Sequence, residues 1–231
     1  MPTCSNCGER NSDSAKFCQE CATPLRSRPA APQEARKTVT ILFCDLVGST
    51  ALGERLDSES LREIMDRYFA EMRAVLERHG GIVEKYIGDA VMAVFGLPRT
   101  HEDDALRVVR AALEMRVALE RLNAELEHDW GMSLANRTGV NTGEVVIGDP
   151  TSGQRLTTGD AVNVAARLEQ AAPTNRVLIG EPTYRLLRDA IEVESVEPVE
   201  LKGKSERLPA FLLVGVNQSR RVSPTDSTLP W

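Results

Sequence analysis

The chain has 231 residues, of which 42% are hydrophobic and 27% charged, and its 28 basic and 34 acidic side chains give a net charge of −6. This length and apolar content suffice for one core-forming domain of roughly 150–200 residues with a small segment attached, and they exclude a wholly disordered chain. The excess of acidic residues excludes a broad basic face that would bind duplex nucleic acid. The sequence shows neither an apolar run of about 20 residues nor a leader in which a basic segment precedes an apolar one, so we expect a cytoplasmic protein without a membrane anchor.

The first segment of the chain contains four of the five cysteines, arranged as two C-x-x-C pairs separated by ten residues. A two-residue spacing lets both sulfurs of a pair reach one metal ion, and two pairs supply the tetrahedral ligand set of Zn²⁺. Disulfides are the alternative, but without an export signal we do not expect them, and the segment has too few large apolar residues to fold without metal. We therefore expect a zinc domain over residues 1–25, with structural Zn²⁺ bound by Cys4, Cys7, Cys18 and Cys21.

This segment resembles the short N-terminal zinc ribbons of bacterial multidomain proteins, in which a glycine follows the second cysteine of each pair. Gly8 fits that pattern and Ala22 departs from it. An alanine there would strain the second turn slightly and leave the ligand set intact. Such ribbons bind nucleic acid or protein, or cap a neighbouring domain. The sequence leaves these roles open, and a cap or adaptor is the simplest of them.

Composition divides the remainder of the chain into three parts. Residues 26–37 contain two prolines and no large apolar residue, which predicts a linker. A second domain is expected over residues 38–216, followed by a polar, flexible tail over residues 217–231. The second domain begins with the β-branched and aromatic run Thr38–Cys44, which predicts a buried strand that ends at Asp45.

Strand and helix patterns then alternate along the domain. Apolar residues from Leu61 to Leu76 recur at helical spacing, and the apolar runs 82–87 and 90–95 are joined at Gly88-Asp89, which predicts a tight hairpin. The order strand, helix, hairpin, helix, strand predicts an α+β fold of the ferredoxin-like βαββαβ type, with its helices on one face of an antiparallel sheet. The other expected elements are a long helix that starts near residues 102–104 and includes Leu122, strands 133–142 and 145–147, a helix over 160–170 and a strand over 176–179.

Two acidic residues stand at strand ends of this expected sheet. Asp45 ends the first strand and Asp89 lies in the hairpin turn, and the βαββαβ order places these points side by side. Paired carboxylates suit Mg²⁺, which takes a few protein oxygens and completes its shell with phosphate oxygens and water. Residues 46–50 form a turn whose backbone N–H groups can meet phosphate. Either aspartate alone would be a turn or cap residue, whereas the pair favours a metal site.

Four further segments stand out, in this order: residues 43–50 (FCDLVGST), 84–93 (EKYIGDAVMA), 137–143 (RTGVNTG) and 159–168 (GDAVNVAARL). In register, they resemble the catalytic domain of class III nucleotidyl cyclases, and the resemblance covers residues 38–216. Four motifs in one order are far more specific than a lone glycine pattern. The resemblance implies ring closure of a nucleoside triphosphate to a 3′,5′-cyclic monophosphate with release of pyrophosphate.

Site roles follow from this resemblance position by position. Asp45 and Asp89 match the carboxylates that bind two Mg²⁺ or Mn²⁺ ions per active site. Asn163 and Arg167 match the catalytic pair that orients the ribose and stabilises charge on the α-phosphate; a solvated polar helix face is the alternative, although apolar residues lie between them. The terminal phosphates are assigned to Arg137 and Lys202.

Base selection is where the sequence departs from the family. Lys85 matches the lysine that donates to N1 of adenine, which implies ATP as substrate. Its partner position holds Leu156, where an Asp or Thr would accept from the 6-amino group, and leucine cannot accept a hydrogen bond. A missing polar contact typically costs about 1–3 kcal/mol, so we expect weaker discrimination between ATP and GTP but retained chemistry.

The resemblance also implies a homodimer in which two chains pair head-to-tail and share each site, the metal carboxylates and Lys85 coming from one chain and Asn163 and Arg167 from the other. An adenylyl cyclase preceded by a zinc ribbon is therefore the leading hypothesis. The alternative is a weakly active or inactive cyclase-like module that binds nucleotide, dimerises and regulates a larger signalling protein. A third hypothesis, a zinc-dependent nucleic-acid binder, requires basic or aromatic residues on the ribbon, and the ribbon has few of them.

Overall fold

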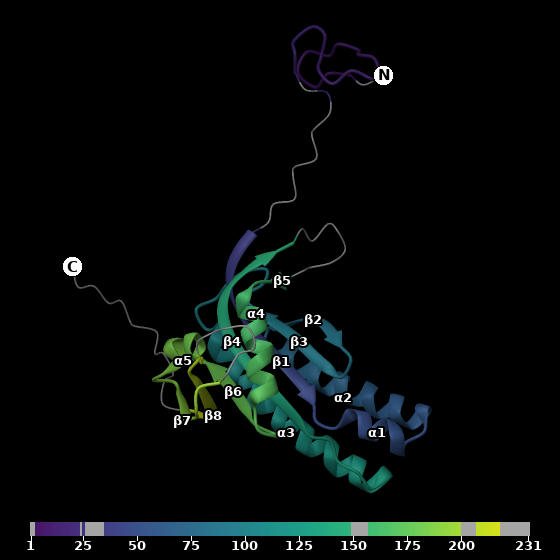
Figure 1. Ribbon diagram of the computed structural model, residues 1–231. Helices are drawn as coiled ribbons and strands as arrows, with labels where there is room; N and C mark the ends of the chain where they lie inside the picture. The colour runs from purple at the N-terminus through teal and green to yellow at the C-terminus, as the bar shows by residue number, and fades with distance from the viewer. Residues whose placement is uncertain (1–2, 24, 26–34, 149–156, 200–206, 218–231) are drawn as a thin grey trace, which may run out of the picture.

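The structure is a computed structural model that describes residues 3–23, 25, 35–148, 157–199 and 207–217 (Figure 1). Residues 35–217 contain a mixed sheet and five helices among the described residues. The strands are β1 (Ala35–Leu46), β2 (Ile82–Ile87), β3 (Ala90–Phe95), β4 (Asn136–Ile147), β5 (Thr157–Thr158), β6 (Val177–Gly180), β7 (Ile191–Ser195) and β8 (Ala210–Val216). The helices are α1 (Ser49–Arg55), α2 (Ser58–Arg78), α3 (Asp104–Trp130), α4 (Asp160–Ala171) and α5 (Glu181–Leu187).

The strands form one sheet in the order β2-β3-β1-β4-β6-β8-β7, with β5 paired to β4. Neighbours in the first half, β2-β3-β1-β4, are antiparallel, which is the order of a ferredoxin-like βαββαβ unit and confirms the expected fold. The β4–β6 pair is parallel, and β6, β8 and β7 extend the sheet beyond that unit. The long central pair β1–β4 runs in continuous register from Ala35↔Ile147 to Leu46↔Asn136.

Alternate residues of β1 face two different helical layers. Leu42 and Cys44 belong to the larger core with α2 and α3, whereas Ile41 and Phe43 belong to a smaller core with α4. The period of two along a strand causes this division. The helices of the βαββαβ unit therefore lie on one face as expected, and α4 covers the opposite face, where Figure 1 shows it crossing the sheet.

The contact between α4 and β4 is a close backbone approach. A Cβ atom at Gly139 of β4 would lie 2.2 Å from Glu169 N and 2.3 Å from Ala165 O, and one at Gly143 would lie 2.7 Å from the Cβ of Ala161. Only glycine leaves room for a helix at this distance. These two glycines fix the height of α4 above the sheet.

Three details differ from the sequence expectations. The separate strands expected over 133–142 and 145–147 were wrong, because Gly143 and Glu144 pair with β1 and make β4 continuous. The first strand begins at Ala35 rather than Thr38, since its early residues pair with the end of β4. The short helix α1 was not expected, because seven residues carry too little periodicity to detect. None of the helices in the described ranges combines enough length and apolar character to cross a bilayer.

Candidate active site and metal centre

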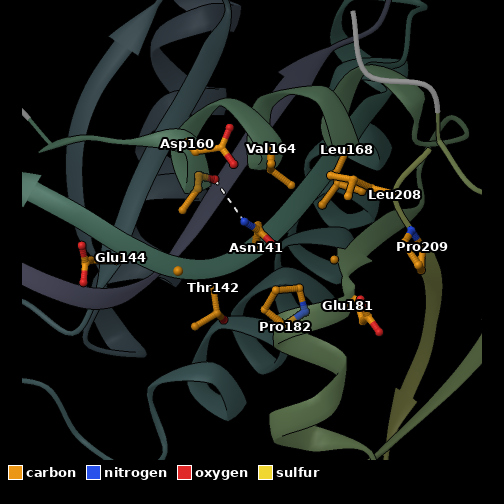
Figure 2. A pocket seen from close by; sticks show the side chains of 13 residues that line it. Asn141, Thr142, Glu144, Asp160, Val164, Leu168, Glu181, Pro182, Leu208 and Pro209 are labelled. Carbon is orange, nitrogen blue, oxygen red and sulfur yellow. Dashed lines mark hydrogen bonds between the residues drawn. The ribbon is translucent and has the colours of Figure 1, made fainter. Parts of the chain in front are cut away.

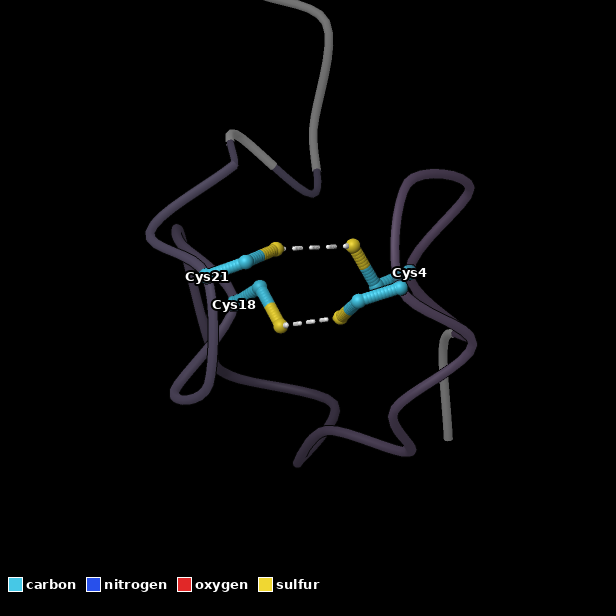
Figure 3. A group of neighbouring side chains, drawn as sticks. Cys4, Cys18 and Cys21 are labelled. Atoms are coloured by element: carbon cyan, nitrogen blue, oxygen red, sulfur yellow. Dashed lines mark hydrogen bonds between the residues drawn. The ribbon is translucent and has the colours of Figure 1, made fainter.

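The four cysteines of the first segment converge on one point (Figure 3). Their Sγ atoms all lie within 4.8 Å of one another, with Cys4 3.6 Å from Cys21 and Cys7 3.5 Å from Cys18. Sulfurs around a tetrahedral zinc ion at about 2.3 Å stand roughly 3.8 Å apart, which these separations match. All four are free thiols in this structure, and their arrangement fits a Cys₄ zinc site.

Neighbouring polar groups support this cluster. Asn11, which is buried, donates to Cys18 Sγ at 3.7 Å and accepts from the N–H of Gln19 at 2.9 Å. The Thr23 hydroxyl lies 3.1 Å from Cys21 Sγ and lowers the pKa of that thiol to about 6. Contacts that favour the thiolate are those expected around a structural metal.

The two turns after the second cysteine of each pair have the same backbone conformation. Gly8 and Ala22 have φ angles of 79° and 57°, and each N–H donates to the carbonyl of the first cysteine of its own pair at 2.9 Å. The left-handed conformation costs a non-glycine residue about 1–2 kcal/mol. The strain expected at Ala22 is therefore present, and the ligand geometry is kept.

The strand-end carboxylates of the second domain also come together. Asp45 lies at the end of β1, and Asp89 lies in the β2–β3 turn, where Gly88 has a φ of 64°. Because β3 pairs with β1 at Cys44↔Val91, the turn is adjacent to Asp45. Burial and the nearby Asp89 carboxylate raise the pKa of Asp45, and Arg137 partly offsets this rise. Two carboxylates at close range favour a bound cation.

The turn after Asp45 fits phosphate only in part. Gly48 has a φ of 75°, a conformation suited to glycine, and precedes α1. The N–H of Val47 is already donated to Ala135 O at 2.8 Å, so it is not available to a ligand. If residues 46–50 contact phosphate as expected, the backbone N–H groups after Val47 have to make that contact.

Arg137 faces the same carboxylates from the neighbouring strand. It pairs with Asp45 in the β1–β4 register, and its Nη2 lies 3.7 Å from Asp45 Oδ2 and 3.5 Å from Glu169 Oε1. Its Nη1 donates to Gln170 O at 3.2 Å. Glu169 was not expected at this site, although it stands four residues after Ala165 on the inner face of α4. That spacing was the available signal.

Asn163 and Arg167 lie on one face of α4, as their four-residue spacing predicts, and this is the outer face of the helix. Asn163 is exposed and Arg167 is half-buried, and neither side chain forms a hydrogen bond or ion pair with another described residue. One chain thus leaves them without contacts to Asp45 or Asp89 in its described part. Lys85 on β2 is exposed, and Leu156 and Lys202 lie outside the described residues.

A separate pocket of about 370 Å³ lies between α4, the start of α5 and Leu208-Pro209 (Figure 2). Its walls include Val164 and Leu168, and the buried amide of Asn141 donates to Ala161 O at 3.2 Å within it. None of the described residues expected to bind nucleotide or metal lines this pocket. The pocket is therefore distinct from the carboxylate cluster.

Comparison with known proteins decides the family. The model of the adenylate and guanylate cyclase catalytic domain matches residues 31–215. The chain belongs to this family. A zinc-ribbon model also matches residues 3–25 of this cyclase-family chain.

Individual relatives agree with that assignment. An adenylate cyclase of Anabaena cylindrica is 33% identical over 76% of this chain and 36% of its own length. The crystal structure of the adenylyl cyclase CyaB from P. aeruginosa is 32% identical, with a TM-score of 0.75, over 82% of this chain and 98% of that one. The guanylyl cyclase Cya2 also gives a TM-score of 0.75, at 29% identity over 82% of this chain and 98% of that one. The chain spans only 9–39% of the first four curated relatives it matches.

Proposed function

We propose that the domain that begins with β1 at Ala35 and extends to residue 216 is an adenylyl cyclase that converts ATP to 3′,5′-cyclic AMP and pyrophosphate, and that residues 1–25 form a zinc ribbon. The expected linker is shortened at its end, because residues 35–37 belong to β1, and its remainder, residues 26–34, lies outside the described residues, as does the expected tail after residue 217. The observation that carries the activity is the convergence of Asp45, Asp89 and Arg137 at one sheet edge in the cyclase fold. Two carboxylates and a guanidinium supply what a metal-bound triphosphate needs.

Each residue has a defined task in this mechanism. Asp45 and Asp89 would hold two Mg²⁺ or Mn²⁺ ions, which when bound make the ribose 3′-hydroxyl more acidic and neutralise the triphosphate. Arg137 and Lys202 bind the terminal phosphates and so stabilise the pyrophosphate leaving group. Asn163 orients the ribose, and Arg167 stabilises charge that develops on the α-phosphate.

A head-to-tail homodimer is part of the proposal. The side chains of Asn163 and Arg167 make no hydrogen bond or ion pair with Asp45 or Asp89 within the described part of the chain, which supports their supply by a second chain. Exposed apolar side chains surround the carboxylate site, with Val47, Tyr86 and Ile87 showing 37%, 42% and 49% exposure. Apolar side chains exposed beside a polar site suit a protein interface.

Lys85 favours ATP, because a lysine ammonium donates to the unprotonated N1 of adenine and not to the protonated N1 of guanine. Leu156 supplies no acceptor for the 6-amino group. This one residue favours the second candidate function, a cyclase-like module that binds nucleotide and dimerises with weak or no turnover. Cyclic-nucleotide formation by the purified chain, with ATP or GTP and with Mg²⁺ or Mn²⁺, separates the two candidates.

Mixed dimers test the shared site. Asp45→Ala removes a metal ligand and Asn163→Ala removes a transition-state contact, so each variant alone should be nearly inactive. A mixed dimer places both lesions in one site and none in the other. With free subunit exchange about half of the dimers are mixed, so activity should return to roughly a quarter of wild type. No recovery, with exchange shown by differently tagged subunits, would contradict a site shared between chains.

A further inference from the structure

Glu169 is a buried charged residue that the proposed mechanism leaves without a task. Its side chain is 6% exposed and lies on the inner face of α4, where the absence of a Cβ at Gly139 brings the helix close to β4. Glu169 Oε1 has no hydrogen-bond partner, and its ion pair in the described chain is the one to Arg137. A buried carboxylate that is incompletely paired is costly, so a role beyond packing is expected of it.

The Arg137 guanidinium lies between two carboxylates that differ in solvent exposure. Asp45 is 24% exposed and faces it from β1, and Glu169 faces it from α4 at a similar distance. Neither distance is short enough for a good hydrogen bond, and the buried Nε of Arg137 has no partner. Electrostatic attraction from two sides, with the Gln170 carbonyl, sets the position of the guanidinium.

Metal binding would weaken the attraction of only one of these carboxylates, that of Asp45, for the Arg137 guanidinium. Under the proposed function, the Asp45 carboxylate is occupied by the metal ions and attracts Arg137 less. In this structure Glu169 does not lie close enough to Asp45 and Asp89 to form a three-carboxylate cluster with them, since the cysteine cluster is the one group of three or more metal-ligand side chains among the described residues. Glu169 thus remains as the counter-charge of Arg137 when nucleotide and metal are present.

We propose that Glu169 is a positioning residue that holds the Arg137 guanidinium in place for the terminal phosphates of the nucleotide. This role rests on the proposed function and on the phosphate contact assigned to Arg137. It adds a residue of α4 to the half of the site that is otherwise built from β1, β4 and the β2–β3 turn. The same helix presents Asn163 and Arg167 on its other face, so one rigid element carries groups for two sites of a dimer.

A double-mutant cycle tests this role on the full chain. Glu169→Gln keeps the shape of the side chain and removes its charge, and it is measured alone and together with Arg137→Gln. The ligands are 3′-deoxy-ATP, which lacks the nucleophile and cannot cyclise, and 3′-deoxy-AMP, which lacks the terminal phosphates. Both are titrated calorimetrically with Mn²⁺, and KM and kcat for ATP are measured in parallel.

Positioning through Arg137 predicts a specific pattern. Glu169→Gln should weaken 3′-deoxy-ATP binding on the order of 10-fold and raise KM for ATP with it, because a coupled charge pair contributes at about that scale. The same substitution should change the affinity for 3′-deoxy-AMP by less than about 2-fold. When Glu169→Gln is introduced into Arg137→Gln, the affinity for 3′-deoxy-ATP should also change by less than about 2-fold. Glu114→Gln is the matched control, since Glu114 pairs with Arg78 at 2.6 Å and His79 at 2.7 Å on the opposite helical layer.

Other patterns overturn the role. Equal loss for both ligands, additive effects of the two substitutions, or no loss in Glu169→Gln would each show that Glu169 does not act through Arg137. Thermal midpoints of all variants show whether a loss of binding comes from unfolding. If it does, the cycle is repeated with Glu169→Asp, which keeps the charge and should bind 3′-deoxy-ATP at near wild-type affinity. A wild-type chain that binds neither ligand would refute the proposed function itself, which distinguishes the two failures.

Discussion

Gly139→Ala is the sharpest test of how α4 is placed on the sheet. A Cβ at this position would lie 2.2 Å from Glu169 N and 2.3 Å from Ala165 O, and ordinary contact begins at 3.4 Å, so the helix must move by about 1.2 Å. The opposing atoms are backbone atoms that cannot rotate away. Overpacking of this kind costs about 3 kcal/mol, the upper end of the usual range. At about 2–4 °C per kcal/mol for a domain of this size, the thermal midpoint should fall by roughly 6–12 °C.

Turnover should fall further than stability indicates. The displaced helix carries Asn163 and Arg167, and a misplacement of about 1 Å can reduce the rate on the order of 100-fold. Gly143→Ala should have a smaller effect on both, because its Cβ would lie 2.7 Å from a single side-chain atom of Ala161. Gly215→Ala in β8 is the matched control, since nothing lies within 4 Å of its Cβ.

Calorimetric midpoints and cyclic AMP formation at saturating ATP give the comparison. The expected order of damage is Gly139→Ala, then Gly143→Ala, with Gly215→Ala close to wild type. If Gly139→Ala kept its midpoint within about 2 °C and its full turnover, the close approach of α4 to β4 would be refuted. Equal loss in all three variants would instead point to a general effect of side chains in these strands.

Three further predictions follow from the metal centre, the base pocket and the buried carboxylate. Chelation should release one zinc ion per chain and leave the thermal transition of the cyclase-family domain unchanged, and metal analysis that finds no zinc in protein purified without chelator would contradict this. Leu156→Asp should raise the ATP/GTP ratio of kcat/KM, and a flat or lower ratio would remove Leu156 from the base pocket. Burial and the Asp45 carboxylate raise the pKa of Glu169 to about 7, so the folded chain keeps a proton that the unfolded chain releases between about pH 4.5 and 7. The contribution of this group to the free energy of unfolding therefore falls as pH rises through that window. In urea unfolding of the metal-free proteins, the stability of Glu169→Gln relative to the wild type should rise by up to about 3 kcal/mol from pH 5 to pH 8. A stability difference that stays constant with pH would contradict the raised pKa.

Most of the fold was predictable because its pattern is local. The hairpin at Gly88 and the helix through Leu61 and Leu76 are visible in the sequence as apolar periodicity interrupted by glycine. The continuity of β4 was not predictable, because Gly143 and Glu144 look like a turn until pairing with β1 is known. Tertiary pairing overrode local propensity at that point.

The candidate site divides in the same way. Asp45 and Asp89 could be paired from the strand order alone, and the structure places them at one sheet edge. The environment of Arg137 could not be foreseen, because Glu169 reaches it only through the close packing of α4 on Gly139. A sequence pattern shows which face of a helix is apolar, but not which buried acid on that face meets a cation on a strand.

The burial of Cys44 makes thiol chemistry a way to follow the two domains separately. Cys44 is fully buried, its Sγ lies 3.4 Å from the Tyr68 hydroxyl, and burial raises the pKa of its thiol to about 11. An alkylating reagent reacts with thiolates, so it should not modify Cys44 while the core is folded. The remaining four thiols are those of the cysteine cluster that fits zinc. Alkylation counted by mass spectrometry should therefore give no adducts for the zinc-loaded chain, four after chelation and a fifth only when the sheet unfolds.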